Sequence, residues 1–352
     1  MNLIVTSQLA ALLHFIAQPP PLGRVILDAS LCAASALAQK DGGTLDFRFN
    51  PGAADCHAAA PPPLEVHPFN ESTYIIRESL CATFEAPIMY LLIGSQKALL
   101  IDSGDVADPH AMPLADTVLK LLPTNDHGRL PLLVAHTHRH QDHRAGDGQF
   151  AGQSLVQVIG FDLDSVKRDL GFLDWPNRTA TIDLGDRTVD VIPTPGHNAT
   201  HIAFYDRNTA LFFSGDFFMP GRLLIEDKAA DLASAKRVVE FLADRPVRAV
   251  LGAHIELGSD GRLFDWGSTY HPNEHALAMS KEDLMALPGL IEQFNGWYSR
   301  RGPFVMVNQN HMLLLWAALF VVLIGLLGYG AYRLIRRRSR RRAATVVSPA
   351  PP

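Results

Sequence analysis

The stretch AHTHRHQDHRAG, residues 135–146, places four histidines and one aspartate within eight consecutive positions. The apolar run LLVA leads into it, so the cluster begins near the end of a predicted buried strand. Alternate residues of a strand point to the same side, so His138 and His140 can chelate one ion. Asp142 and His143 follow after a turn and can reach a second ion. Because imidazole and carboxylate are natural zinc ligands, the stretch predicts a metal centre.

Further ligand-type residues follow three apolar strands later in the chain. His197 comes after VIPTPG, Asp216 after LFFSG and His254 after VLGA. Open α/β layers collect functional residues at the carboxyl ends of their strands. Metal sites of hydrolases use three protein ligands for each ion and leave one position open for water. These three residues are therefore predicted to complete the centre.

The pattern of apolar residues before residue 255 predicts a layered α/β domain. Short apolar runs begin at about Thr73 and alternate with segments of helical spacing. Strands are expected at TYIIRES, MYLLIG, KALLID, LLVAHTH, TATIDLGDRTVDVIPT (a pair), HIAFYD, TALFFSGD and VRAVLGAH, and helices at residues 114–122 and 232–245.

Five motifs of this chain resemble, in order and in spacing, those of the metallo-β-lactamase superfamily of binuclear hydrolases. They are LLIDSG (99–104), THRHQDH (137–143), TPGH (194–197), SGD (214–216) and GAH (252–254). The resemblance covers about residues 70–255. It implies a four-layer αββα sandwich with the metal ions at one edge.

The resemblance also implies a role for each candidate ligand. His138, His140 and His197 would hold the first ion, Asp142, His143 and His254 the second, and Asp216 would bridge both. Two Zn²⁺ ions are expected, with iron or manganese as alternatives. A hydroxide between the ions would attack a thioester, an ester or lactone, or a phosphodiester, with Asp142 orienting it and passing a proton. Asp102 would orient a ligand, and His136 would be a buried bystander.

The family resemblance narrows the substrate class but leaves alternatives open. A bridging aspartate such as Asp216 is usual in the family's thioesterases, lactonases and phosphodiesterases, so we favour a glyoxalase-II-like thioesterase or lactonase over a β-lactamase. Tyr270, His271 and His275 are candidates to line a substrate pocket, or are surface residues. A tethered metal-binding sensor without turnover and a mononuclear iron sulfur-oxygenase remain alternatives. The net charge of -5 gives no reason to expect nucleic acid, so a small-molecule substrate is expected.

The C-terminal part of the chain predicts a membrane anchor. Residues 312–332, MLLLWAALFVVLIGLLGYGAY, carry no charge, and at ~1.5 Å rise per residue they span a hydrocarbon core of about 30 Å. Seven of the 31 basic residues follow between Arg333 and Arg342. By the positive-inside tendency this tail is cytoplasmic and the catalytic domain lies outside the cytoplasm, with the span in the lipid bilayer.

The N-terminal part predicts export. Ala36-Leu37-Ala38 has the small-x-small pattern of a signal-peptidase site, although a start codon downstream of Met1 is an alternative. Cys56 and Cys81 could form a disulfide outside the cytosol. The predicted organisation is a signal peptide (1–38), a linker (39–69), a catalytic domain (70–257), a helical extension (258–311), a transmembrane helix (312–332) and a basic cytoplasmic tail (333–352).

Overall fold

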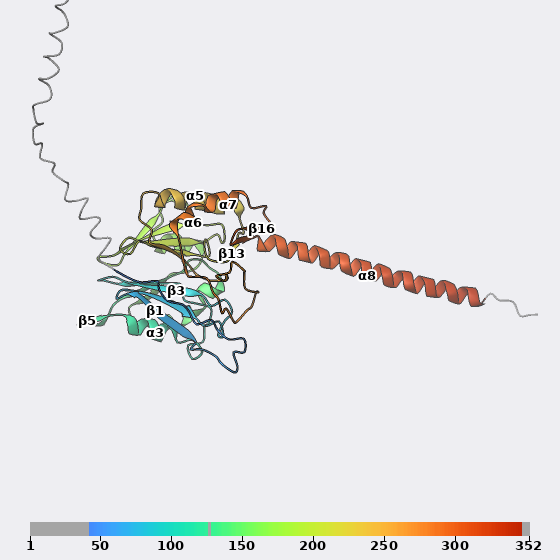
Figure 1. The fold of residues 1–352 in the computed structure, drawn as a ribbon, viewed down its shortest axis with the longest axis horizontal. Coiled ribbons are helices and arrows are strands. Elements are labelled where there is room, and N and C mark those ends of the chain that lie inside the picture. Colours follow the sequence, from blue (N-terminus) through green and yellow to red (C-terminus); the bar gives the residue numbers. More distant parts are fainter. Residues whose placement is uncertain (1–41, 126–127, 347–352) are drawn as a thin grey trace, which may run out of the picture. The chain divides into compact units, whose positions relative to one another are not determined.

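Two six-stranded sheets packed face to face form the centre of the molecule in the computed structural model, which describes residues 42–125 and 128–346 (Figure 1). Helices cover the outer face of each sheet. This is the four-layer αββα arrangement that the sequence predicts, so the fold class is confirmed. The predicted signal peptide lies outside the described residues.

The first sheet has the strand order β1-β2-β3-β4-β7-β8. Its first four strands are antiparallel neighbours, and β7 and β8 then add in parallel. The strands are β1 (Leu64–Asn70), β2 (Thr73–Glu78), β3 (Ile88–Ile93), β4 (Ala98–Ile101), β7 (Leu132–Ala135) and β8 (Val156–Val158), and the short hairpin β5 (Thr124–Asn125) and β6 (Gly128–Arg129) lies between β4 and β7 in the chain.

The second sheet has the strand order β15-β14-β12-β11-β10-β9. β12 and β14 are parallel, and β10 runs in the same direction because β11 pairs with both β10 and β12 in the antiparallel sense. The strands are β9 (Ala180–Asp183), β10 (Thr188–Pro193), β11 (Ile202–Asp206), β12 (Leu211–Gly215), β14 (Ala249–Gly252) and β15 (Ala278–Met279).

The central strands are apolar throughout because both of their faces are buried. Successive side chains point to opposite faces, so Ile75 of β2 enters the core between the sheets while Ile76 packs under the outer helix. Between the sheets, Tyr90 of β3 meets Phe213 of β12 with ring centroids 4.6 Å apart. This packing fixes the two sheets against each other and so fixes their strand ends.

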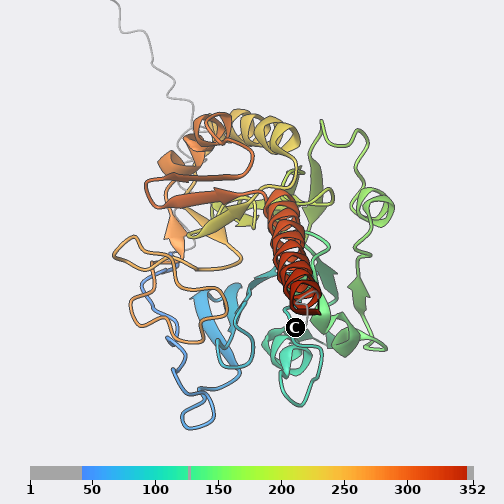
Figure 2. The same cartoon turned by 90° about the vertical axis from the view of Figure 1, so that its right-hand side faces the viewer.

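Each outer face is covered by amphipathic helices (Figure 2). On the first sheet α3 (Leu114–Leu121) buries Leu114 and Val118. On the second sheet α5 (Lys228–Leu242) packs beside α7 (Leu287–Glu292), and Asp227 caps α5 by accepting from two backbone N–H groups. Two shorter helices are α4 (Leu163–Asp169) and α6 (Lys281–Met285).

The segment after residue 257 differs from the helical extension that was expected. It does contain α6 and α7, but it also supplies β15 to the second sheet. Its last strands, β16 (Tyr298–Arg301) and β17 (Phe304–Val307), form a separate three-stranded sheet with β13 (Arg222–Leu224). The sequence did not predict these strands because β15 and β17 pair with strands earlier in the chain. The partner of β17 lies about 80 residues before it.

The segment expected to be a linker is also packed onto the domain. Phe49 is buried in the core between the sheets, and Phe47 lies against it with ring centroids 5.2 Å apart. Cys56 and Cys81 form a disulfide that ties this segment to the loop after β2. The first strand, β1, already begins at Leu64.

The C-terminal helix α8 (Gln309–Val346) contains the whole of the predicted span at residues 312–332. Among the described residues it is the one helix that is long and apolar enough to cross a membrane, and its apolar side chains are not buried by the rest of the chain. It is therefore a candidate membrane span.

The disulfide yields a test of the packed N-terminal segment. Replacing both cysteines, Cys56→Ser with Cys81→Ser, should lower the free energy of unfolding by about 3 kcal/mol, because the bridge closes a loop of 25 residues. Denaturant titration of the two proteins measures the difference. An unreduced wild-type protein whose intact mass shows two free thiols at these positions would contradict the assignment.

Candidate metal centre

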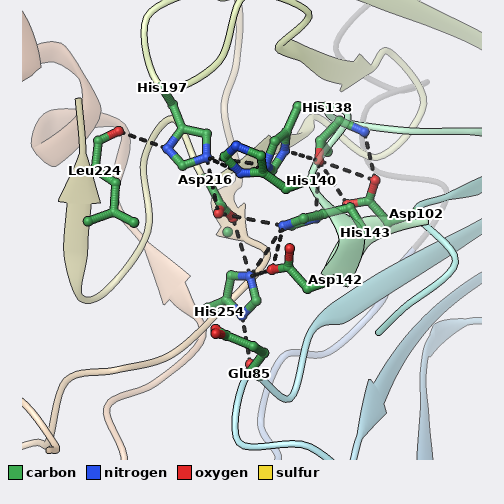
Figure 3. Close-up of polar contacts among 12 residues, drawn as sticks. Glu85, Asp102, His138, His140, Asp142, His143, His197, Asp216, Leu224 and His254 are labelled. Atoms are coloured by element: carbon green, nitrogen blue, oxygen red, sulfur yellow. Dashed lines mark hydrogen bonds and ion pairs between the residues drawn. The ribbon is translucent and has the colours of Figure 1, made fainter. Parts of the chain in front are cut away.

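The candidate ligands lie where four strands end. The HxHxDH segment follows β7, His197 follows β10, Asp216 follows β12 and His254 follows β14. The last residue of β7 is Ala135, so the chain leaves the sheet before the first ligand and turns through a short 3₁₀ helix at Gln141–His143. These turns bring residues more than 100 positions apart in the sequence into one cluster (Figure 3).

The first group consists of His138, His140 and His197. Nε2 of His138 lies 2.8 Å from Nδ1 of His140 and 3.2 Å from Nε2 of His197. Nδ1 of His140 lies 3.1 Å from Nε2 of His197. Three nitrogens bound to one tetrahedral zinc ion lie about 3.3 Å apart, so this spacing suits a single cation.

The second group consists of Asp142, His143, Asp216 and His254. The Oδ2 atom of Asp142 lies 3.2 Å from Nε2 of His143 and 3.3 Å from Nε2 of His254. The two imidazole nitrogens are 3.4 Å apart. This arrangement of two nitrogens and two carboxylates also has the composition of a divalent metal site.

Asp216 stands between the two groups. Its Oδ2 atom lies 3.5 Å from Nε2 of His143 and 3.6 Å from Nε2 of His197, so one oxygen faces a histidine of each group. Its Oδ1 atom makes no hydrogen bond and lies 3.5 Å from Nε2 of His254. Both oxygens of this buried carboxylate face imidazole nitrogens without a hydrogen bond, at distances that leave room for a cation between them, so the residues present fit bound metal.

The outward-facing nitrogens of the imidazoles are held by fixed partners, which leaves the inner nitrogens to face the cluster. The partners are the Leu224 carbonyl for His197 Nδ1 (2.8 Å), the Glu85 carbonyl for His254 Nδ1 (2.7 Å), Asp102 Oδ2 for His143 Nδ1 (3.0 Å), Thr137 Oγ1 for His138 Nδ1 (3.1 Å) and Asn198 Nδ2 for His140 Nε2 (3.1 Å).

Asp102 is the residue that the sequence assigned to orienting a ligand, and the structure places it against His143. It is buried directly after β4, and it also accepts the backbone N–H of Thr137 at 2.7 Å. Its φ of 66° lies in the left-handed region, which is strained for a residue other than glycine. The neighbouring contacts hold that conformation in place.

Gly215 permits the close approach of the two sheets at the site. It has a φ of 54°, and a Cβ atom there would lie 2.8 Å from Cβ of Thr137 and 2.9 Å from Nε2 of His201. Any larger residue would push Thr137 away from Asp102 or shift the turn that carries Asp216.

The first group is electrically neutral. Burial, reinforced by the neighbouring imidazoles, lowers the pKa of His138 well below its usual range. Burial likewise lowers the pKa of His140 and that of His197. Neutral imidazole is the form that ligates metal, so these three side chains are prepared for binding near neutral pH.

The second group is charged. Burial acts to lower the pKa of His143 and of His254, but the carboxylates of Asp142 and Asp216 outweigh it. As a result the pKa of His143 lies well above its usual range and that of His254 is raised to about 10. Burial acts to raise the pKa of both carboxyl groups, yet the nearby imidazoles hold each pKa below its usual range. The two ionised carboxylates therefore stabilise positive charge on the two imidazoles.

His136 lies apart from both groups. It is buried, and its nearest charged neighbour is Asp147, with Nε2 and Oδ2 3.3 Å apart. The structure thus places it where the sequence expected it, in the core beside the site.

A cavity of about 320 Å³ opens onto the ligands His140, Asp142, His197, Asp216 and His254. The candidates Tyr270, His271 and His275 do not line this cavity. His271 is instead buried against Glu274, 3.1 Å away, and stacked on Phe264 with ring centroids 3.8 Å apart. His271 and His275 line a separate cavity of about 340 Å³, and His271 also lines a small cavity beside His254, so their part in substrate binding stays a prediction.

The sequence interpretation missed most of the cavity wall. The wall is completed by Glu85, Gln141, Met219, Arg222, Leu224, Glu256, Trp266 and Gln309. Burial raises the pKa of the Glu85 carboxyl to about 7. Apart from Gln141, which lies within THRHQDH, none of these residues belongs to a ligand motif, and they come from segments far apart in the chain, so only the fold reveals them.

Comparison with known proteins agrees with this geometry. A model of the metallo-beta-lactamase superfamily matches residues 83–254, a range that includes all seven candidate ligands. The chain is 25% identical over 236 residues to the acyl-coenzyme A thioesterase MBLAC2 of Gallus gallus, covering 58% of this chain and 84% of that protein. It is 30% identical over 186 residues to the hydroxyacylglutathione hydrolase of Rhodospirillum rubrum, covering 50% of this chain and 68% of that protein.

Among solved structures, a metallo-β-lactamase from Erythrobacter litoralis aligns with a TM-score of 0.47 and 13% identity, over 67% of this chain and 99% of that one. The family model, the curated hydrolases and the His/Asp cluster point to the same conclusion. The chain belongs to the metallo-β-lactamase superfamily.

Proposed function

We propose that the two groups bind two divalent cations, with zinc as the first choice. His138, His140 and His197 hold one ion, Asp142, His143 and His254 hold the other, and Asp216 is shared by both. The observation that carries this proposal is the position of Asp216, whose Oδ2 atom faces both groups and whose Oδ1 atom faces His254 without a hydrogen bond.

The protein is proposed to hydrolyse a thioester, ester or lactone, with thioesters favoured. The named relatives support this choice, since one is an acyl-coenzyme A thioesterase and the other a hydroxyacylglutathione hydrolase. Bound divalent cations supply Lewis acidity, which lowers the pKa of a coordinated water toward about 7 and polarises a carbonyl.

Asp142 is the residue proposed to handle the proton. Its carboxylate lines the cavity while Oδ2 contacts His143 and His254. The imidazoles hold its pKa below the usual range against the opposing effect of burial, so it is ionised and can orient a water molecule. Asp102 acts indirectly, because it holds His143 and the backbone of Thr137 in place and does not line the cavity.

The chain is also proposed to be anchored in a membrane through α8, with the catalytic domain outside the cytoplasm. The arginines after the span support this orientation by the positive-inside tendency. The disulfide between Cys56 and Cys81 supports an oxidising compartment.

Metal content distinguishes the ligands from the bystander. His138→Gln should lower the metal content of the purified protein from two ions per chain to one, because it removes one of three ligands of the first group. His136→Gln is the matched control and should keep both ions, since that buried side chain belongs to neither group. Elemental analysis counts the ions. Equal metal content in the two variants would refute the ligand assignment.

Metal uptake should release protons. The pKa of His254 is raised to about 10 and that of His143 is raised as well, so both are protonated at about pH 7 and must lose a proton to ligate. The affinity of chelator-treated protein for zinc should therefore fall as the pH falls from about 10. Calorimetry in buffers of different ionisation enthalpy counts the protons, and His254→Gln should release one fewer. Uptake without proton release would contradict the charge state.

A substrate panel tests the reaction itself. Thioester, lactone and phosphodiester probes are offered to the metal-loaded protein, and turnover of the thioester is expected. Asp142→Ala should lower kcat by at least about a hundredfold with the circular dichroism spectrum retained. Asp164→Ala, which changes an exposed aspartate of α4, is the matched control. Two bound ions without turnover on any probe would indicate a metal-binding sensor instead.

A further inference from the structure

The candidate span begins at the wall of the metal cavity. Gln309 is the first residue of α8, and it lines the same cavity as His140, His197 and Asp216. The uncharged stretch starts at Met312, three residues later. At ~1.5 Å rise per residue this is less than one helical turn. The mouth of the cavity and the start of the span are therefore neighbours.

The junction between them is fixed by hydrogen bonds on both sides. Asn308 is buried; its Nδ2 group donates to the Glu226 carbonyl at 3.1 Å, and its Oδ1 atom accepts from the backbone N–H of His311 at 3.0 Å. Nδ1 of His311 lies 2.8 Å from the carbonyl of Gly296. These contacts fix the first turn of α8 to the rest of the domain. When α8 enters a bilayer, the mouth of the cavity therefore lies close to the bilayer surface.

The hairpin beside this junction has the composition of a lipid-facing surface. Trp297 and Tyr298 are both about half exposed, and the Trp297 ring packs against His311 with centroids 5.0 Å apart. Arg300 and Arg301 of the same strand, β16, are exposed. Tryptophan and tyrosine prefer the membrane–water interface, and arginine is attracted to anionic headgroups there.

Two partly exposed aromatic side chains lie beside the metal cavity. Trp266, which lines the metal cavity, is 56% exposed, and its ring lies 5.8 Å from that of Phe84, which is 40% exposed. Both rings also line an adjoining cavity with His254 and Glu85. We call Phe84 and Trp266 the aromatic rim. The Arg222 guanidinium lies 5.9 Å from the centre of the Trp266 ring, and the exposed parts of both rings offer apolar contact to a ligand that enters the cavity.

We propose that the substrate is an amphiphile, a long-chain acyl thioester presented at the lipid surface, whose chain lies along the aromatic rim while its carbonyl enters the metal cavity. This inference rests on the proposed hydrolase function and specifies its substrate class. In the reaction the oxygen of water joins the acyl carbon and the C–S bond breaks. One proton of water passes to the leaving thiolate, and the other is released as the new carboxylic acid ionises.

The test uses the full-length, metal-loaded protein in vesicles of phosphatidylcholine and phosphatidylglycerol. Butanoyl and hexadecanoyl thioesters of N-acetylcysteamine serve as probes, and release of the free thiol measures turnover. The kcat/KM for the hexadecanoyl probe should exceed that for the butanoyl probe by about tenfold or more, since each buried methylene adds favourable transfer free energy.

Two changes to the protein test the aromatic rim and the membrane anchor independently. Trp266→Ala should lower the hexadecanoyl-to-butanoyl ratio by about tenfold, whereas Leu173→Ala, at an exposed position that lines none of the metal-site cavities, should not change it. A flexible spacer of about twenty residues after His311 reaches roughly 25 Å and should lower hexadecanoyl turnover in vesicles about tenfold. The same spacer after Arg341, beyond the span, is its control.

The outcomes separate this inference from the function on which it rests. Turnover of both probes with equal kcat/KM, or with a ratio that neither Trp266→Ala nor the first spacer alters, overturns the amphiphile proposal and leaves the hydrolase intact. No turnover of either probe by protein that carries its metal overturns the amphiphile proposal, and the hydrolase function falls as well when lactone and phosphodiester probes are also left intact.

Discussion

The metal centre depends on the shared direction of the strands that carry its ligands. β10, β12 and β14 run the same way, so His197, Asp216 and His254 emerge at one edge of their sheet. Backbone polar groups are satisfied by the ladders up to that edge, and the chain beyond it is free to turn. A slip of one residue in any of these strands would turn its side chains to the opposite face. The apolar packing between the sheets therefore sets ligand spacings of about 3 Å.

The site divides into a part that a reader of the sequence can predict and a part that only the fold supplies. Ligands are predictable because their chemistry restricts them to His and Asp just beyond strand ends, as at Asp216. The expectation that His138 and His140 alternate on a strand was wrong, because β7 ends at Ala135. The cavity wall has no such restriction, so Glu85 and Trp266 carry no motif. His271 is stacked on Phe264 and bonded to Glu274, and it lines a small cavity beside His254 rather than the metal cavity itself.

The fold divides in the same way. Strands buried on both faces, such as β3 and β12, are apolar from end to end and were predicted correctly. β1 and β13 are only partly buried, and their pattern is weak. The segment before β1 is rich in Ala and Pro and was therefore taken as a linker. Phe47 and Phe49 nevertheless hold it against the core, and the sequence does not show this because most of their partners are distant along the chain.

The carbonyl of Leu224 aligns His197, and Leu224 belongs to β13, which pairs with β17 immediately before α8. The strand whose carbonyl aligns this candidate ligand and the strand that leads into the candidate span thus belong to one small sheet. A chimaera that joins this catalytic domain to a foreign membrane segment must retain β16 and β17, because removing them strips the backbone partner from β13.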